Sequence, residues 1–331
     1  MKRRSFLKAA AVSSVAGSFL LGCGEKEPAL KDAATDVMPA KIARLGVGLF
    51  TIPLWLEQDF AGTLKKLAGF GYKELEFYGP FPFSVKSAHD RWNEITPNLP
   101  FSGSGYFGLT AKEVREAMDA NGLTSPSMHA DLETLETNLD ELAEAANILG
   151  QKYAGIAAIP DHLRTSLDDY KRMADRFNEI GRRMQAHGMQ FLYHNHGYGL
   201  VELEGKIPMR VILERTDPNY VAMEMDVFWT VAGRADPVAY LNEYKGRYKL
   251  MHLKDMAELV HFSGDGGKPD EWIGLFPKMA DAGAGVLDLH GILAAARTSG
   301  VDHYYLERDM AAEPDKTLKD SFDNLTALTF S

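Results

Sequence analysis

The sequence predicts a single (β/α)8 barrel, and three observations lead to this fold class. From residue 44 onward, short apolar runs alternate with longer segments in which apolar residues recur at helical spacing. The apolar runs number eight, and eight parallel strands are what closes a barrel of this kind. The chain of 331 residues is 45% hydrophobic, which is enough for the large core of one such domain.

The expected strands are the eight apolar runs, at residues 45–50, 73–77, 125–129, 153–159, 190–194, 220–226, 249–253 and 304–307. Helices are expected between them, at residues 60–69, 111–121, 132–149, 166–187, 237–244 and 289–299. Glycines follow several of these segments closely, as is typical of helix ends: Gly71, Gly122, Gly188 and Gly300.

An open, doubly wound sheet is the competing fold for alternating strands and helices. That fold normally carries a phosphate-binding turn rich in glycine after its first strand. Gly46 and Gly48 form only a GxG, and no suitable GxxG follows them. The closed barrel is therefore the better prediction.

Composition and charge exclude some functions. The formal net charge is −10, and no excess of Lys and Arg suggests a nucleic-acid partner. Cys23 is the one cysteine, so an internal disulfide is impossible and the core alone must stabilise the fold. After the first residues no stretch approaches the roughly 18 apolar residues that suggest a spanning helix.

The first 23 residues are typical of an export signal. A basic start is followed by an apolar run over residues 9–21, as in signal peptides. Arg3 and Arg4 resemble a twin-arginine signal, and residues 20–23 (LLGC) resemble a lipobox in which Cys23 would carry the lipid. A plain cleaved signal with an incidental cysteine is the alternative. We therefore expect a signal over 1–23, a flexible polar tether over 24–43 and the barrel over 44–331.

This start also predicts location and membrane contact. The protein is expected to be exported, by the twin-arginine route, as a periplasmic or cell-envelope lipoprotein, with membrane contact only through its N-terminal lipid anchor. Twin-arginine export carries proteins that have already folded in the cytoplasm. Barrels of this type often dimerise, so a homodimer is an alternative to a monomer.

Two long connections follow predicted strands, at residues 78–110 and 256–286. Both follow the carboxyl ends of strands, where barrel active sites form. They contain many aromatic residues, including Trp92 and Trp272, which would suit the apolar face of a sugar. Lids over a site and ordinary surface insertions are the two interpretations of such segments.

Acidic and histidine residues end four consecutive predicted strands. They occur in the runs His194-Asn195-His196, Glu224-Met225-Asp226, His252-Leu253-Lys254-Asp255 and Glu307-Arg308-Asp309. Carboxylates and imidazoles without thiolates suit Mn²⁺, Mg²⁺, Co²⁺ or Zn²⁺ in a non-structural site. Each residue alone could be a helix cap or an ion-pair partner, but four consecutive strand ends together predict a divalent-metal site.

The same motifs resemble the sugar phosphate isomerase/epimerase family of xylose isomerase-like TIM barrels. The resemblance covers residues 44–331 and includes YHNH at 193–196, MEMDVFW at 223–229, MHLKDM at 251–256 and YLERD at 305–309. It implies that Asp226, His252 and Glu307 are metal ligands and that a fourth ligand comes from the fifth strand. Well-known members carry a Glu there, which also moves a proton. This chain offers His194 or His196 instead.

That departure bears on the mechanism. A two-carboxylate epimerase uses one Glu on each face of the substrate carbon, and here only Glu307 remains. A histidine, His194 or His196, is a competent base near neutral pH, and Lys254 could stabilise an enolate or pair with Asp255 or Glu224. The remaining candidates are expected to bind substrate, and an ordinary structural role is the alternative for them: Glu76, His129, Glu224, Asp255, Trp229 and Arg308.

Three functions fit this site. The first is a metal-dependent isomerase or epimerase of a non-phosphorylated sugar or keto-sugar, with an enediolate-type intermediate. The second is a lyase or hydratase of a 3-keto-sugar or 3-keto-glycoside that uses the same metal site. The family resemblance implies this reaction for some exported members. The third is a non-catalytic sugar-binding lipoprotein. A DNA-repair nuclease is disfavoured by the acidic charge, by export and by too few extra histidines.

Overall fold

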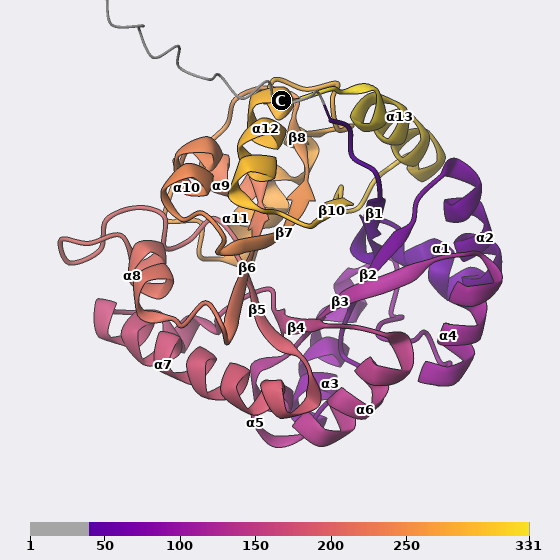
Figure 1. The fold of residues 1–331 in the computed structure, drawn as a ribbon, viewed down its shortest axis with the longest axis horizontal. Helices are drawn as coiled ribbons and strands as arrows, with labels where there is room; N and C mark the ends of the chain where they lie inside the picture. Colours follow the sequence, from indigo (N-terminus) through magenta and orange to yellow (C-terminus); the bar gives the residue numbers. More distant parts are fainter. Residues whose placement is uncertain (1–39, 331) are drawn as a thin grey trace, which may run out of the picture. The chain divides into compact units, whose positions relative to one another are not determined.

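Eight parallel strands form a closed barrel in the computed structural model, which describes residues 40–330 (Figure 1). Around the barrel the order is β1, β10, β7, β6, β5, β4, β3 and β2, so the barrel closes between β1 and β10. The barrel strands are β1 (Leu45–Gly48), β2 (Glu74–Tyr78), β3 (Thr124–Ala130), β4 (Tyr153–Ile156), β5 (Gln190–His194), β6 (Val221–Asp226), β7 (Tyr248–Leu253) and β10 (His303–Leu306). Two short antiparallel strands, β8 (Asp255–Met256) and β9 (Met279–Ala280), pair outside the barrel.

Helices surround the barrel. They are α1 (Pro53–Gln58), α2 (Phe60–Phe70), α3 (Lys86–Ile95), α4 (Ala111–Ala120), α5 (Leu132–Thr137), α6 (Leu139–Leu149), α7 (Leu167–Met184), α8 (Pro208–Arg215), α9 (Val227–Ala232), α10 (Pro237–Glu243), α11 (Pro269–Leu275), α12 (Leu289–Ser299) and α13 (Pro314–Ala327). Short 3-10 turns cover Leu49–Thr51, Thr96–Asn98, Asp161–Leu163, Gln185–His187 and Phe276–Lys278. No helix of the described residues is both long and apolar enough to cross a membrane.

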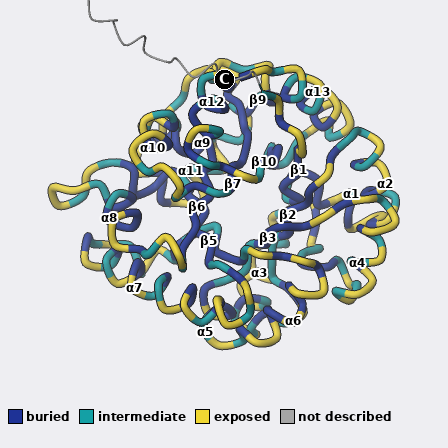
Figure 2. Tube along the Cα trace, in the orientation of Figure 1, coloured by how far each residue is buried: buried dark blue, intermediate teal, exposed yellow. Residues whose placement is uncertain are grey.

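Helix α7 illustrates how the sequence specifies these elements. Ser166 and Asp169 form a capping box at its start, which satisfies backbone donors that have no partner within the helix. Tyr170, Phe177 and Met184 recur at helical spacing and are buried against the barrel. Figure 2 shows the same division throughout, with buried strands in the centre and exposed outer faces on the helices.

The interior of the barrel changes from apolar to polar along the strands. Near the amino ends, Leu192, Ala222, Leu250 and Tyr305 form a buried apolar layer. Side chains two residues further along a strand point to the same face. The next interior positions on β5, β6 and β7 are therefore His194, Glu224 and His252, which are all buried. The apolar layer thus forms a floor beneath a polar cluster at the carboxyl ends.

The predicted barrel is confirmed, and the differences are local. The expected helix at 132–149 is two helices, because Asn138 has a non-helical backbone and its side-chain amide donates to Phe83 O at 3.0 Å. The expected strand at 153–159 ends at Ile156. Helices α1, α3, α8, α9, α11 and α13 were not predicted; α9 is an apolar run that directly continues a strand.

Candidate metal centre and substrate pocket

Asp226, His252 and Glu307 come together at the carboxyl ends of β6, β7 and β10. One ligand atom of each residue lies within 4.8 Å of the others, and all three side chains are buried. His252 Nδ1 lies 2.8 Å from Glu307 Oε2 and 3.9 Å from Asp226 Oδ2. We call these three residues the outer group. They are the three ligands that the family resemblance implied.

The ammonium of Lys254 lies in the outer group. Its Nζ is 3.0 Å from Asp226 Oδ2, 2.8 Å from Glu307 Oε2 and 2.7 Å from Asp309 Oδ2. Although burial lowers the pKa of Lys254, these carboxylates outweigh it and raise the pKa well above its usual range. Lys254 is therefore charged, and it partly neutralises three buried acids.

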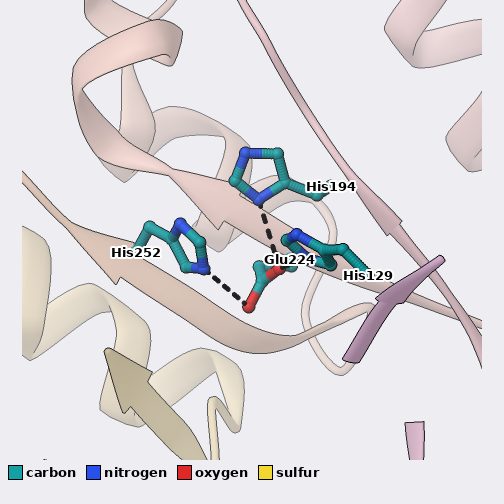
Figure 3. Close-up of side chains that lie close together, drawn as sticks. All are labelled: His129, His194, Glu224 and His252. Atoms are coloured by element: carbon teal, nitrogen blue, oxygen red, sulfur yellow. Dashed lines mark hydrogen bonds and ion pairs between the residues drawn. The ribbon is translucent and has the colours of Figure 1, made fainter. Parts of the chain in front are cut away.

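A second group of possible ligands lies deeper in the barrel. It consists of His129, His194, Glu224 and His252, whose ligand atoms also lie within 4.8 Å of one another (Figure 3). Glu224 Oε2 is 2.7 Å from His129 Nε2 and 3.1 Å from His194 Nδ1. We call this the inner group. Glu76 borders it, with Oε2 at 2.5 Å from His252 Nε2.

Burial and crowded charges shift several pKa values. Burial, together with the charge of Glu76, raises the pKa of Glu224 to about 7. Burial also raises the pKa of Asp309 to about 6. In Glu307 burial acts in the same direction, but the charges of His252 and Lys254 outweigh it and hold the pKa well below its usual range.

The outer group fits a divalent cation. Its donors are two carboxylates and an imidazole, a set typical of Mn²⁺, Zn²⁺ and similar ions. Asp226 Oδ1 caps α9 by accepting from Trp229 N at 2.9 Å. Asp226 Oδ2 is buried and accepts no hydrogen bond; its close neighbour is the charge of Lys254. Buried oxygens without a hydrogen bond are costly unless something else, such as a cation, satisfies them.

The histidines of the fifth strand have different positions. His194 belongs to the inner group, and its Nε2 lies 3.8 Å from Asp226 Oδ2 in the outer group. His196 belongs to neither group. Its Nδ1 lies 2.7 Å from Ala157 O, and its ring stacks on Trp272 at a centroid distance of 4.4 Å. Of the two, His194 is placed to complete the metal ligands.

A pocket of about 430 Å³ opens above this cluster. Glu76, His129, His194, His252 and Glu307 lie in its lining. Aromatic and apolar side chains also line it: Phe50 from the turn after β1, Tyr78 from β2, Trp92 and Ile95 from α3, and Trp229, Trp272 and Phe276 from the region after β6 and β7. Both long connections thus contribute to the pocket, the first through α3 and the second through Trp272 and Phe276.

The structure does not bring two expected substrate-binding residues into this pocket. The carboxylate of Asp255 accepts backbone hydrogen bonds from Gly283, Gly285 and Leu287 at 3.0–3.1 Å, so it organises a loop. Arg308 binds the side chain of Asp281. These side-chain contacts of both residues thus lie away from the pocket.

Two other residues that were predicted to bind substrate, Trp229 and Glu224, lie in the pocket lining and beneath the pocket, respectively. Trp229 lines the pocket, with its ring centroid 5.3 Å from Lys254 Nζ. Glu224 lies beneath the pocket in the inner group. Asp309 was missed, although it lines the pocket and pairs with Lys254. Its place in the strand-end motif was the available signal. The signal, Cys23 and residues 24–39 of the tether lie outside the described residues. Residues 40–43, which were predicted as tether, belong to the barrel domain, because Ala40 pairs with Phe330 and Ile42 is buried in the core.

The chain belongs to the xylose isomerase-like TIM barrel family, whose model matches residues 64–328. This confirms the family that the motifs indicated. Inosose dehydratase of Lacticaseibacillus casei is similar, with 28% identity over 163 residues, or 47% of this chain and 51% of that protein. The chain thus spans about half the length of the curated relative that it matches.

Two solved structures share the fold. A sugar phosphate isomerase/epimerase from Parabacteroides distasonis has a TM-score of 0.65 and 23% identity, covering 89% of this chain and 97% of that one. The IOLI protein with a bound zinc atom has a TM-score of 0.60 and 15% identity, covering 86% and 95%. At these identities the likeness concerns the barrel alone.

Proposed function

We propose that this chain is a divalent-metal-dependent enzyme that removes water from, or adds it to, a non-phosphorylated keto-sugar. The observation that carries this proposal is the tautomer and orientation of the His196 ring. A carbonyl only accepts hydrogen bonds, so His196 Nδ1 donates to Ala157 O and the proton of the neutral ring is on Nδ1. Nε2 is left with a lone pair on a ring that lines the pocket.

His196 presents an oriented, unprotonated nitrogen to the pocket. Burial and the nearby charge of Lys254 lower the pKa of His196 to about 3, so the ring is neutral at physiological pH and is a weaker base than a free imidazole. Trp272 stacks on the ring and holds its plane. The fixed tautomer and orientation of His196, and not its basicity, suit it to remove a proton next to a ketone.

Four residues would hold the metal: Asp226, His252, Glu307 and His194. When bound there, a divalent ion would polarise the ketone oxygen as a Lewis acid. The name of the similar inosose dehydratases and the zinc atom of the IOLI structure support this proposal. The inosose dehydratase name also favours the lyase hypothesis over the isomerase hypothesis.

The chemical step then follows from the residues of the pocket. His196 Nε2 takes the proton from the carbon next to the ketone, and negative charge moves onto the ketone oxygen. The ammonium of Lys254 stabilises this charge. The C–O bond at the β-carbon breaks as the C=C bond forms, and the proton leaves His196 with the departing hydroxide as water.

The pocket does not favour a phosphorylated substrate. Among the described residues, Arg91 and Lys254 are its basic lining residues. Lys254 offers only a single ammonium, and the exposed side chain of Arg91 lies 3.8 Å from Asp131. A phosphate binds best to several free Arg or Lys side chains or to backbone donors.

Isomerisation or epimerisation is the second candidate. Glu307 lines the pocket as an ionised carboxylate, so it offers a second proton acceptor besides His196. The same first proton abstraction would then be followed by return of the proton to carbon instead of loss of hydroxide.

Proton NMR in D₂O separates these functions. Metal-loaded protein is mixed with free sugars, 3-keto-sugars and 3-keto-glycosides, with His196→Gln and Asp226→Ala as inactive controls. We expect a new vinyl proton signal as water is lost. Deuterium on an α-carbon with an isomeric product would instead establish the isomerase or epimerase. A silent panel with every metal would contradict both and favour a sugar-binding protein.

A further inference from the structure

Each of the two buried histidines, His194 and His252, faces Glu224 or Glu76 with one ring nitrogen and a carboxylate of the outer group with the other. His252 Nε2 lies 2.5 Å from Glu76 Oε2, while Nδ1 faces Glu307 at 2.8 Å. His194 Nδ1 lies 3.1 Å from Glu224 Oε2, while Nε2 faces Asp226 at 3.8 Å. The pattern is the same, although the nitrogen that faces Glu76 is Nε2 in His252 and the nitrogen that faces Glu224 is Nδ1 in His194.

A neutral imidazole has one N–H and one lone pair, and a metal binds only the lone pair. A carboxylate that accepts a hydrogen bond from one ring nitrogen therefore decides which nitrogen is free. We propose that Glu76 and Glu224 are positioning residues. Glu76 keeps the proton of His252 on Nε2, and Glu224 keeps the proton of His194 on Nδ1. The lone pairs of both rings are then directed at the outer group.

Both carboxylates are themselves held in place. Glu76 is buried and its Oε1 accepts from Ser127 Oγ at 2.6 Å. Glu224 is fully buried, and its Oε2 is shared between His194 and His129, which lies 2.7 Å away. Fixed acceptors of this kind orient the rings before any metal arrives. The arrangement also gives His129 a role: it anchors Glu224.

Glu76 and Glu224 thus orient His252 and His194 toward the metal site. The competing interpretation is that the inner group holds an ion of its own, since Glu224 Oε1 is buried without a hydrogen bond. The observed distances favour the orienting role, because each ring has its shorter carboxylate contact on the side of Glu76 or Glu224. For His252 the distances are 2.5 Å to Glu76 and 2.8 Å to Glu307, and for His194 they are 3.1 Å to Glu224 and 3.8 Å to Asp226. The inference rests on the proposed metal site, but it does not depend on which reaction the site catalyses.

Zinc affinity of the isosteric variants Glu76→Gln and Glu224→Gln tests the inference. A glutamine keeps the shape but weakens the hydrogen bond that fixes the ring. We expect each variant to bind Zn²⁺ about 10- to 100-fold more weakly in competition titrations, with an unchanged circular dichroism spectrum. Glu74→Gln is the matched control, because Glu74 is also a buried β2 carboxylate bonded to a histidine, His303 at 2.8 Å, but lies near the other end of the strand. It should bind Zn²⁺ like the wild type.

The histidine tautomers provide a second readout that needs no variant. In ¹⁵N-edited NMR spectra of the zinc-loaded wild type, His252 should be protonated at Nε2 and His194 at Nδ1. The opposite tautomer of His252, unchanged affinity in both Gln variants, or two zinc ions per chain would overturn the inference. A wild type that binds no zinc would contradict the proposed function itself, so the two failures are distinguishable.

Discussion

Lys254 and Asp309 form a buried ion pair, with Nζ and Oδ2 2.7 Å apart, and the same ammonium also contacts Asp226 and Glu307. Three buried carboxylates thus share one lysine when no metal is bound, and His252 is a further partner of Glu307. Removing one partner of a buried ion pair typically costs about 3–5 kcal/mol, because a charge is left uncompensated. A divalent cation would take over part of this compensation.

Lys254→Met should therefore lower the stability of the metal-free protein by about 3–5 kcal/mol. Added Mn²⁺ or Zn²⁺ should raise the melting temperature more in this variant than in the wild type, since the ion replaces the missing positive charge. Differential scanning fluorimetry with and without metal measures both effects. Lys86→Met, at an exposed lysine, is the control and should change neither. Equal metal-induced shifts in wild type and Lys254→Met would argue against an ion in the outer group.

The two histidines at the carboxyl end of β5, His194 and His196, should separate metal binding from catalysis. His194→Ala should weaken metal binding strongly, because a lone pair directed at Asp226 and its neighbours is lost. His196→Gln should bind metal normally and lose at least about 100-fold in turnover, the usual contribution of a general base. Metal content by mass spectrometry and turnover of a keto-sugar are the measurements. Loss of metal from the His196 variant would show that the assignment is reversed.

Glu74 should contribute a pH-dependent part of the stability. Burial raises its pKa, but the hydrogen bonds and charges of His303 and Arg44 outweigh burial and hold the pKa below its usual 4.5. The folded-state pKa is thus lower than the unfolded one, so the contribution is present above about pH 4.5 and is lost as the pH falls through the folded-state pKa.

Accordingly, Glu74→Gln should be less stable than the wild type at pH 7, by roughly 1.5–3 kcal/mol for lost bonds to charged groups. The difference should shrink below about pH 4.5, where Glu74 becomes protonated. Urea unfolding between pH 7 and pH 3 measures it. A constant difference across this range would mean that the charge of Glu74 contributes nothing.

Lipid attachment at Cys23 is a prediction from the sequence alone. Expression of the full chain in a bacterium should place it in the membrane fraction, and Cys23→Ala should move it to the soluble periplasmic fraction. Replacing Arg3 and Arg4 by lysines should retain the protein in the cytoplasm if export uses the twin-arginine route. Fractionation and immunoblotting provide the readout. A membrane-bound Cys23→Ala protein would contradict the lipid anchor.

Periodicity predicted the barrel because the signals for strands and helices are local. The strand Gln190–His194 and the helix Leu289–Ser299 have the expected bounds, since each is apolar with a clear stop. The break at Asn138 depends on a contact with Phe83, which is distant in the sequence. No local pattern contains that information. Helix α9 was missed because six mostly apolar residues continue the pattern of β6.

The candidate site was predicted at the level of strand ends but not of side-chain direction. Asp226, His252 and Glu307 converge because alternate residues of parallel strands share the barrel interior. Glu307, Arg308 and Asp309 come directly after β10, and their directions still follow the alternation of the strand. Asp309, in phase with Tyr305 and Glu307, reaches Lys254 in the pocket, whereas Arg308 turns outward to Asp281.

Ala40 and Phe330 pair through backbone hydrogen bonds of 2.8 and 2.9 Å before β1 begins. This pairing lies at the amino ends of the strands, whereas the pocket opens at the carboxyl ends. A solid support or a fused protein attached near either residue would therefore leave the mouth of the pocket clear. Joining the chain at this point and opening it in another surface loop should also give a circularly permuted protein that keeps the barrel.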